Sequence, residues 1–134
     1  MNILNISEFI EQSKPNIFTH RNIAQLWMSG YGSTYKNSSI QNNKWYEYKN
    51  EKWIPVCNTE YMLILIKYTL ASAVTQYLAC LSQIFLTDPN PSVKLLENMN
   101  LGIKMMSHLN NHQFIRGVLR ECAESAYNPN LENC

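Results

Sequence analysis

The chain has 134 residues and a mass of 15.6 kDa, enough for one domain and too short for two of ordinary size. Apolar residues make up 46% of it and charged residues only 16%, which supports a packed core and excludes a charged, disordered tail. Its 11 basic and 10 acidic residues leave a net charge of +1, which excludes a polybasic protein held to phosphate by bulk charge alone.

Two short helices are predicted at the start of the chain. Ser7 is a suitable N-cap for the first, which we expect to end at Lys14-Pro15. Thr19 is a suitable N-cap for the second, whose apolar residues recur every three or four positions: Ile23, Leu26 and Trp27. Gly30 and Gly32 are expected to stop this second helix.

A β-hairpin is predicted next, after a polar loop over 33–43 that holds at most one weak strand. Two aromatic runs, 45–48 and 53–56, flank the polar turn 49–52, and Pro55 places the second arm at a sheet edge. The hairpin carries the densest aromatic cluster of the chain: Trp45, Tyr46, Tyr48 and Trp53. Since alternate strand residues share a face, we expect Trp45 and the residue two positions on to pack against the helices while the others point outward. The favoured role of the cluster is to fasten the hairpin to the helices; the alternative is stacking on nucleic-acid bases.

The rest of the chain is predicted to form three helices. The first is capped by Asn58 or Thr59 and runs to about Leu86. The second begins with Asn90 as cap and Pro91 as first helical residue. The third covers about 112–126 after an Asn-rich break at 107–111. Three-to-four spacing predicts the inward residues: Leu63, Ile66, Leu70, Ala73, Tyr77, Leu81 and Ile84 in the first helix; Leu96, Met99, Ile103 and Met106 in the second; Ile115, Val118, Leu119 and Cys122 in the third. The predicted fold is therefore mainly α: a single small helical domain over 1–134 with one short aromatic β-hairpin inserted after the first two helices.

The common enzyme motifs are missing from the sequence. It contains no Gly-x-x-x-x-Gly-Lys-Ser/Thr phosphate loop and no Gly-x-Ser-x-Gly elbow, so we predict no catalytic residue. His108 and His112 have the spacing of two metal ligands on one helix face, but no cysteine or carboxylate accompanies them at a matching near spacing. We interpret them as exposed turn residues and predict no metal; a metal-dependent enzyme that uses both histidines is the third alternative.

Basic residues outnumber acidic ones in the helical region. Residues 61–120 contain five basic and two acidic residues, and Arg116 and Arg120 lie one helical turn apart, with Lys104 on the preceding helix. These three cations are the candidate nucleic-acid-binding residues, because a basic face attracts phosphate. The alternative is a solvated face on which Arg120 pairs with Glu124.

No signal peptide and no membrane span are predicted, so we expect a cytoplasmic protein with no membrane partner. The chain starts without a basic region followed by a long apolar one, and its most apolar stretch, 61–86, is interrupted by Lys67, Gln76 and Gln83. The four cysteines are scattered, without a Cys-x-x-Cys motif, and are predicted to be reduced thiols: Cys57, Cys80, Cys122 and Cys134.

The order of these features resembles the domain just upstream of the superfamily 3 helicase in primase–helicases of large DNA viruses, phages and plasmids, in particular those of poxvirus type. The resemblance covers 19–134. It rests on His20-x-Asn22-Ile23-Ala24, the aromatic hairpin, the long helical region, and the segments Val118–Cys122 and Tyr127–Glu132. The sequence departs from the family at the turn 49–52, where family members often have a glycine.

This resemblance implies that the chain is a fragment whose parent continues beyond Cys134 into an ATPase. It implies a non-catalytic collar domain that helps a ring, expected to be a hexamer of identical chains, to assemble, and that contacts DNA weakly. The fragment itself would bind no cofactor, whereas the parent chain would be an ATP-dependent DNA helicase with a primase, using ATP and Mg in the host cytoplasm or at a viral replication site. The alternative is a complete small helical adaptor whose aromatic hairpin docks a protein partner.

Overall fold

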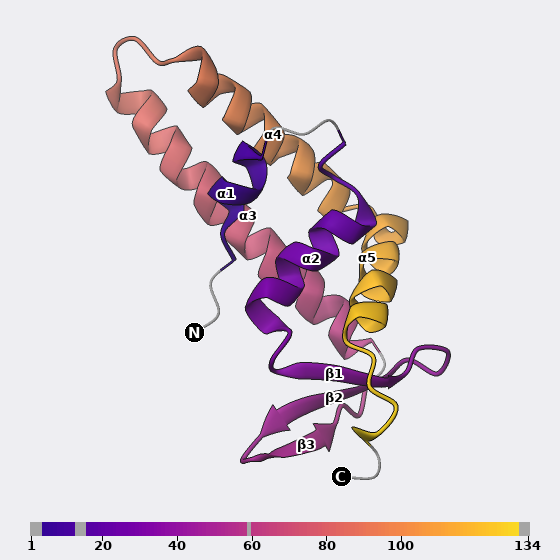
Figure 1. Cartoon of the computed structure of the whole chain (residues 1–134). Helices are drawn as coiled ribbons and strands as arrows, with labels where there is room; N and C mark the ends of the chain where they lie inside the picture. Colours follow the sequence, from indigo (N-terminus) through magenta and orange to yellow (C-terminus); the bar gives the residue numbers. More distant parts are fainter. Residues whose placement is uncertain (1–3, 13–15, 59, 132–134) are drawn as a thin grey trace.

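The computed structural model of the chain describes residues 4–12, 16–58 and 60–131. Within these ranges, five helices and three strands follow one another along the chain (Figure 1). They are α1 (Ile6–Glu11), α2 (His20–Tyr31), β1 (Tyr35–Ser39), β2 (Lys44–Lys49), β3 (Lys52–Pro55), α3 (Tyr61–Thr87), α4 (Val93–Leu109) and α5 (His112–Ser125). The predicted fold class is confirmed: the molecule is mainly helical, with a small antiparallel sheet inserted after the first two helices.

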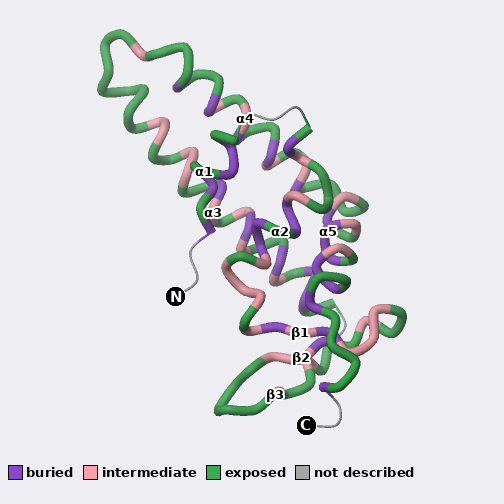
Figure 2. Tube along the Cα trace, in the orientation of Figure 1, coloured by how far each residue is buried: buried purple, intermediate pink, exposed green. Residues whose placement is uncertain are grey.

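The core lies where α2, α5 and the first half of α3 meet. Trp27 of α2 is fully buried there, and its indole N–H donates to Thr69 Oγ1 of α3 at 2.8 Å. Figure 2 shows buried residues gathered in this region and exposed residues along the far end of α3 and α4. That far end of α3 and α4 projects away from the sheet as a long pair of antiparallel helices. The sheet and the end of this helix pair therefore lie at opposite ends of the molecule (Figure 1).

The helix caps are only partly as predicted. Thr19 caps α2 as expected, with the Asn22 N–H donating to Thr19 Oγ1 at 3.1 Å. Asn5, not Ser7, caps α1, because the side chain of Asn5 accepts from the N–H three residues later and leaves Ser7 inside the helix. The predicted end at Lys14-Pro15 lies outside the described residues.

The second half of the chain shows two further corrections. Ser92, not Asn90, caps α4, since the Leu95 N–H donates to Ser92 Oγ at 3.1 Å, whereas Asn90 lies in a turn and donates its N–H to Asp88. The predicted break at 107–111 is shorter than expected, because α4 continues through Leu109.

The starts of α3 and α5 are closer to expectation. Asn58 precedes α3 and its Oδ1 accepts from the Glu60 N–H at 2.9 Å, while Thr59 lies outside the described residues. Glu60, not Asn58, is the residue at the N-cap position of α3, and its side chain makes no capping hydrogen bond. Asn111 caps α5 through the Phe114 N–H, so this helix begins at His112 as predicted.

The sheet has the order β1-β2-β3, and the predicted hairpin is its β2–β3 half. The turn between these strands is Asn50-Glu51, with φ of 52° and 65°, a left-handed pair that fits a two-residue hairpin without glycine. Pro55 lies on the edge strand β3, as predicted. The polar segment after α2 forms β1, which pairs antiparallel with β2. Asn37 of β1 also bonds the C-terminal segment: its N–H donates to Ala126 O at 3.0 Å, and the Asn128 N–H donates to Asn37 O at 2.7 Å.

The inward stripe is confirmed for α5, whereas in α4 it is wrong for Leu96 and Ile103 and only half-buried at Met99 and Met106. All four predicted residues of α5 are buried: Ile115, Val118, Leu119 and Cys122. In α4 the buried face is shifted by about one residue, to Leu95, Asn98, Gly102, Met105 and Leu109, so Leu96 and Ile103 are 41% and 58% exposed. In α3 the predicted stripe is buried only at its start, and Ile84 is half exposed.

Gly102 lies on the buried face of α4, where this helix approaches α3 closely. A Cβ atom at Gly102 would lie 2.6 Å from Cδ2 of Leu78, so α3 and α4 meet at a point where only glycine fits without movement. Because α4 carries apolar residues around most of its circumference, spacing alone does not select the face that turns toward α3.

Among the described residues, α3 is the one helix long and apolar enough to cross a membrane, judged by its length and composition alone. The expectation that the chain has no membrane partner stays a prediction. Only 22% of that apolar stretch is buried within the chain, so much of its surface is left for another contact.

Candidate interaction surfaces

The three cations predicted to bind nucleic acid each have a partner within the chain. Arg116 lies 3.6 Å from the carboxylate of Glu60, and its Nε–H donates to Nε2 of His112 at 2.8 Å. Arg120 pairs with Glu124 at 3.5 Å, the i,i+4 alternative that the sequence offered. All of these groups are exposed or half exposed, where ion pairs contribute little free energy and phosphate can compete for the cations.

Lys104 differs from the two arginines in its contact. Its ammonium lies 5.9 Å from the centroid of the Phe18 ring, within the range of a cation–π interaction. Phe18 in turn packs against the His108 ring at 5.6 Å, and His108 against the Phe114 ring at 4.8 Å. Lys104 therefore covers an aromatic cluster, and its predicted role at nucleic acid stays a prediction.

His108 and His112 do not share a helix face. His108 is in the last turn of α4 and is partly buried by the aromatic cluster, whereas His112 is the exposed first residue of α5. The prediction of exposure is thus right for His112 and wrong for His108, and both histidines lie in helices and not in a turn. The described part of the chain contains no group of three or more His, Cys, Asp or Glu residues placed to hold a metal ion.

The four aromatic residues of the β2–β3 hairpin divide between the two faces of the sheet. Trp45 is 2% exposed and belongs to the core, with its indole N–H donating to Asn43 Oδ1 at 2.9 Å. Tyr48 is 47% exposed and its ring lies 5.1 Å from that of Trp53 on the neighbouring strand. Trp45 thus anchors the sheet to the helices, as predicted, and the Tyr48–Trp53 pair remains on the outside.

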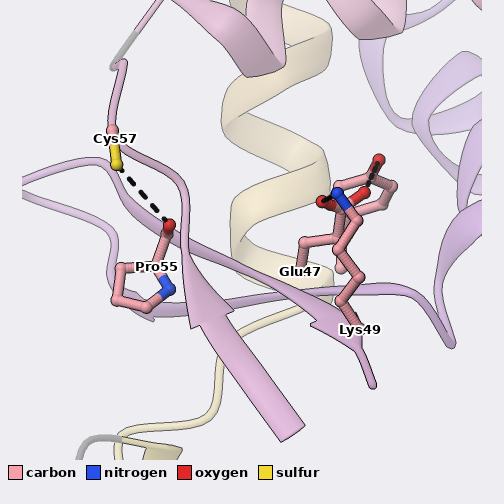
Figure 3. A network of polar contacts seen from close by, with 5 residues as sticks. Glu47, Lys49, Pro55 and Cys57 are labelled. Carbon is pink, nitrogen blue, oxygen red and sulfur yellow. Dashed lines mark hydrogen bonds and ion pairs between the residues drawn. The ribbon is translucent and has the colours of Figure 1, made fainter. Parts of the chain in front are cut away.

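Glu47 lies on the same face of the sheet as the buried Trp45, which we call the inner face, and both of its carboxylate oxygens have a partner there. Its Oε2 accepts from the Tyr35 hydroxyl at 2.8 Å, and its Oε1 lies 3.5 Å from Nζ of Lys49 (Figure 3). Burial, followed by this hydrogen bond to Glu47, raises the pKa of Tyr35 well above its usual value of 10.0. The Tyr35 phenol therefore stays protonated and the two strands β1 and β2 are tied together through side chains.

The three described cysteines are free thiols in different surroundings. Cys57 and Cys80 are exposed, and Sγ of Cys57 lies 4.0 Å from the carbonyl oxygen of Pro55 (Figure 3). Cys122 is buried beneath α2, with Sγ 3.9 Å from the carbonyl oxygen of Ala24, and burial raises its pKa to about 12. Cys134 lies outside the described residues.

The far end of the α3–α4 hairpin carries a second surface that spacing did not predict. We call it the hairpin tip and define it by its exposed large apolar residues: Ile84, Phe85, Leu86, Val93, Leu96 and Ile103. Leu86 and Val93 are 78% and 71% exposed. Between residues 79 and 103 the only charged residues are Asp88, Lys94 and Glu97.

Sequence reasoning missed this surface because it assigned several of its residues to the core. Ile84, Leu96 and Ile103 were expected to face inward, and all three are exposed. The sequence did contain one sign of this surface: Phe85 and Leu86 are apolar although they lie outside the predicted inward stripe. An exposed cluster of large apolar side chains marks a contact with a partner.

The fold is that of a small, mainly helical domain with an inserted three-stranded sheet. No family model and no solved structure matches the chain significantly. A protein of Acanthamoeba polyphaga mimivirus, which carries the name "Putative helicase L207/L206", is 33% identical to it over 115 residues. The match covers 84% of this chain and 12% of the relative, so the chain spans a small part of that protein's length.

The chain is therefore related to a viral protein that is named as a helicase. This agrees with the viral helicase family that the residue pattern resembles. The name of the relative does not mention a primase, a ring or a collar.

Proposed function

We propose that this chain is a non-catalytic collar domain that joins the subunits of a viral replicative primase–helicase into a ring. The observation that carries the proposal is the hairpin tip, a surface of exposed apolar side chains with few charges at one end of the molecule. The relation to a mimiviral protein named as a helicase supports a place within a helicase. The match covers only 12% of that protein, as expected of one domain in a longer chain.

The hairpin tip is suited to a contact between subunits on energetic grounds. Fully burying a large aliphatic side chain contributes about 1.5–3 kcal/mol, and Leu86 and Val93 still have most of their surface to bury. Association costs about 4–15 kcal/mol in lost freedom of motion, so one such contact gives weak binding. In a closed ring each subunit makes two contacts, and weak interfaces then add up to a stable assembly.

The remaining parts of the proposal concern the parent chain. ATP and Mg would act in a neighbouring ATPase domain, and a hexameric ring would pass DNA through its centre during genome replication. Lys104, Arg116 and Arg120 would then contribute weak, salt-sensitive contacts to phosphate, because each must exchange its present partner for the DNA. The predicted location is the host cytoplasm or a viral replication site.

Molar mass measured by light scattering over a range of protein concentrations tests the proposal. We expect the mass of the 134-residue chain to rise with concentration, and the double substitution Leu86→Glu with Val93→Glu to abolish the rise. The matched control is Gln41→Glu with Gln113→Glu, which adds the same two carboxylates at exposed polar positions away from the tip. A mass that stays monomeric at every concentration, or that rises equally in the tip variant, contradicts the proposal.

A membrane is the competing occupant of an apolar tip on a helix as apolar as α3. Flotation with neutral and anionic lipid vesicles distinguishes the two. We expect no flotation of the wild-type chain, and flotation that the tip substitutions abolish would assign the surface to lipid instead.

The adaptor function is the second candidate, and the exposed Tyr48–Trp53 pair is the observation that favours it. An adaptor that docks a partner through this pair has no need of the hairpin tip. It therefore predicts a monomer whose mass is insensitive to the tip substitutions.

A further inference from the structure

The strand register places three aromatic rings on the outer face of the sheet. Trp45 and Glu47 alternate with Tyr46 and Tyr48 along β2, so the two tyrosines share the face opposite to the buried Trp45. Directly paired residues lie on the same face, which adds Trp53 opposite Tyr48. We call this surface the outer sheet face and define it by Lys36, Lys44, Tyr46, Tyr48 and Trp53.

The Tyr48–Trp53 pair is held in place before any ligand arrives. Its ring centroids are 5.1 Å apart with an interplanar angle of 58°, and the two residues belong to adjacent strands of a hairpin closed by a two-residue turn. Tyr48 keeps 47% of its surface exposed. Rings that are already ordered lose little conformational freedom when they bind, so stacking on them is efficient.

The charges of the strands are separated between the two faces. Lys36 pairs with Tyr46 across β1 and β2, and Lys44 precedes Tyr46 by two residues, so both lysines belong to the outer sheet face. The carboxylate of Glu47 lies on the inner face, occupied by Tyr35 and Lys49. Among the described strand residues, the outer sheet face therefore combines aromatic rings with ammonium groups and contains no carboxylate.

Rings next to ammonium groups complement a ligand that has both flat π-systems and a negative backbone. Unpaired nucleotides fit this description, since base–aromatic stacking tolerates any base and lysine neutralises phosphate. A duplex fits it poorly because its bases are already stacked on one another. An acidic peptide would satisfy the lysines and leave the rings without planar partners.

We propose that the outer sheet face binds single-stranded nucleic acid by stacking bases on Tyr48 and Trp53, with Lys36 at the backbone. The inference deepens the proposed function by naming a strand-binding surface at the end of the domain opposite the hairpin tip. The inference rests on the proposed function only in that the protein meets a nucleic acid. It does not depend on the assembly of a ring.

Fluorescence anisotropy with a labelled oligodeoxythymidine of about twelve nucleotides tests the proposal on the 134-residue chain, because single-strand sites commonly cover about 4–16 nucleotides. Tyr48→Ala and Trp53→Ala should each weaken binding about tenfold, the usual effect of removing one stacking ring. Two controls match them: Tyr68→Ala removes a tyrosine that is 70% exposed on α3, and Ile54→Ala removes an exposed side chain from the inner face of β3. Neither control should change the affinity.

Lysine substitutions add a charge test on the two faces of the same sheet. Lys36→Gln should weaken binding and reduce the slope of log affinity against log salt by about 0.7, the value for one phosphate contact to a single strand. Lys49→Gln, which removes a lysine from the inner face, should leave the slope unchanged. Oligouridine RNA and a DNA duplex of equal length identify the strand: DNA and RNA single strands should both bind, and the duplex should bind at least tenfold more weakly.

Tryptophan fluorescence provides a readout that a merely structural role would not change. Trp27 and Trp45 are buried, so quenching on addition of the oligonucleotide should come from Trp53 and disappear in Trp53→Phe, a variant that retains a ring and most of the affinity. Molar mass measured on the same variants separates this inference from the proposed function, because Tyr48→Ala and Trp53→Ala should assemble like the wild type.

Three results would overturn the inference. They are the absence of oligonucleotide binding at low salt, equal binding of duplex and single strand, and loss of binding on changing Arg116 and Arg120 but not on changing the rings. The first would leave the Tyr48–Trp53 pair as a protein-docking site, and the third would assign nucleic acid to α5.

Discussion

Trp45→Ala is the substitution that most directly tests how the sheet is attached to the helices. Trp45 is 2% exposed, and a buried aromatic side chain removes about 150–250 Å² from water, equivalent to about 4–6 kcal/mol at 25 cal/mol per Å². Large-to-small core substitutions of aromatic residues typically cost about 3–5 kcal/mol. The hydrogen bond to Asn43 adds about 1 kcal/mol. We therefore expect a loss of about 4 kcal/mol in the free energy of unfolding.

Urea-induced unfolding followed by circular dichroism measures this loss. With a denaturant dependence of about 2 kcal/mol per molar urea, the midpoint should fall by about 2 M. Tyr48→Ala is the control from the same strand, and its ring is already 47% exposed, so it should cost less than half as much. Trp45→Phe keeps most of the apolar contact and should cost about 1–2 kcal/mol, which keeps the comparison measurable if Trp45→Ala does not fold.

A Trp45→Ala midpoint equal to or above that of Tyr48→Ala would refute the reasoning. It would mean that the sheet is held by its backbone bonds to the C-terminal segment through Asn37, and not by the buried indole.

Three further predictions follow from the same structure. Thr19→Ala should lower the unfolding free energy by about 1 kcal/mol in urea titrations, whereas Ser7→Ala, inside α1 and not at its cap, should change it by less than about 0.5 kcal/mol. Gly102→Leu should force α3 and α4 apart at Leu78 and cost more than about 2 kcal/mol by thermal unfolding, while a variant as stable as the wild type would contradict the close contact. For Cys122, burial raises the pKa from 9.0 to about 12, so its contribution to stability is complete below pH 9 and is lost as the pH rises toward 12. Unfolding titrations between pH 9 and 11 should show a slope of up to about 1.4 kcal/mol per pH unit from this thiol, which Cys122→Ala removes.

Local patterns in the sequence predicted the features that depend on nearby residues. The β2–β3 hairpin was predicted from two aromatic runs around a polar turn. The buried face of α5 was predicted from apolar residues at helical spacing. The Arg120–Glu124 pair was an alternative for the same reason, since residues four apart on a helix are neighbours wherever the helix packs. The pairing of Arg116 with Glu60 joins α5 to the start of α3 and had no such signal.

The same limit applies to the candidate surfaces. The aromatic cluster was visible in the sequence, and alternation along the strand predicted that Trp45 would turn inward while other rings point out. The pairing of Tyr48 with Trp53 and the placement of Lys36 beside them follow from the register between three strands. The first of these strands is polar; it pairs with β2, and its Asn37 also forms backbone bonds to a segment about ninety residues further along the chain.

By itself, the sequence determined that this protein is a small, mainly helical domain with an aromatic hairpin, because hydrophobic period and turn chemistry act over a few residues. Only the tertiary structure decided which side of each apolar helix is covered. In α4 the covered face contains Gly102, next to Leu78, together with Leu95 and Met105, and it leaves Leu96 outside. A helix that is apolar around most of its circumference has several faces of similar burial energy, so the choice among them depends on how closely its neighbour can approach. That choice created the hairpin tip.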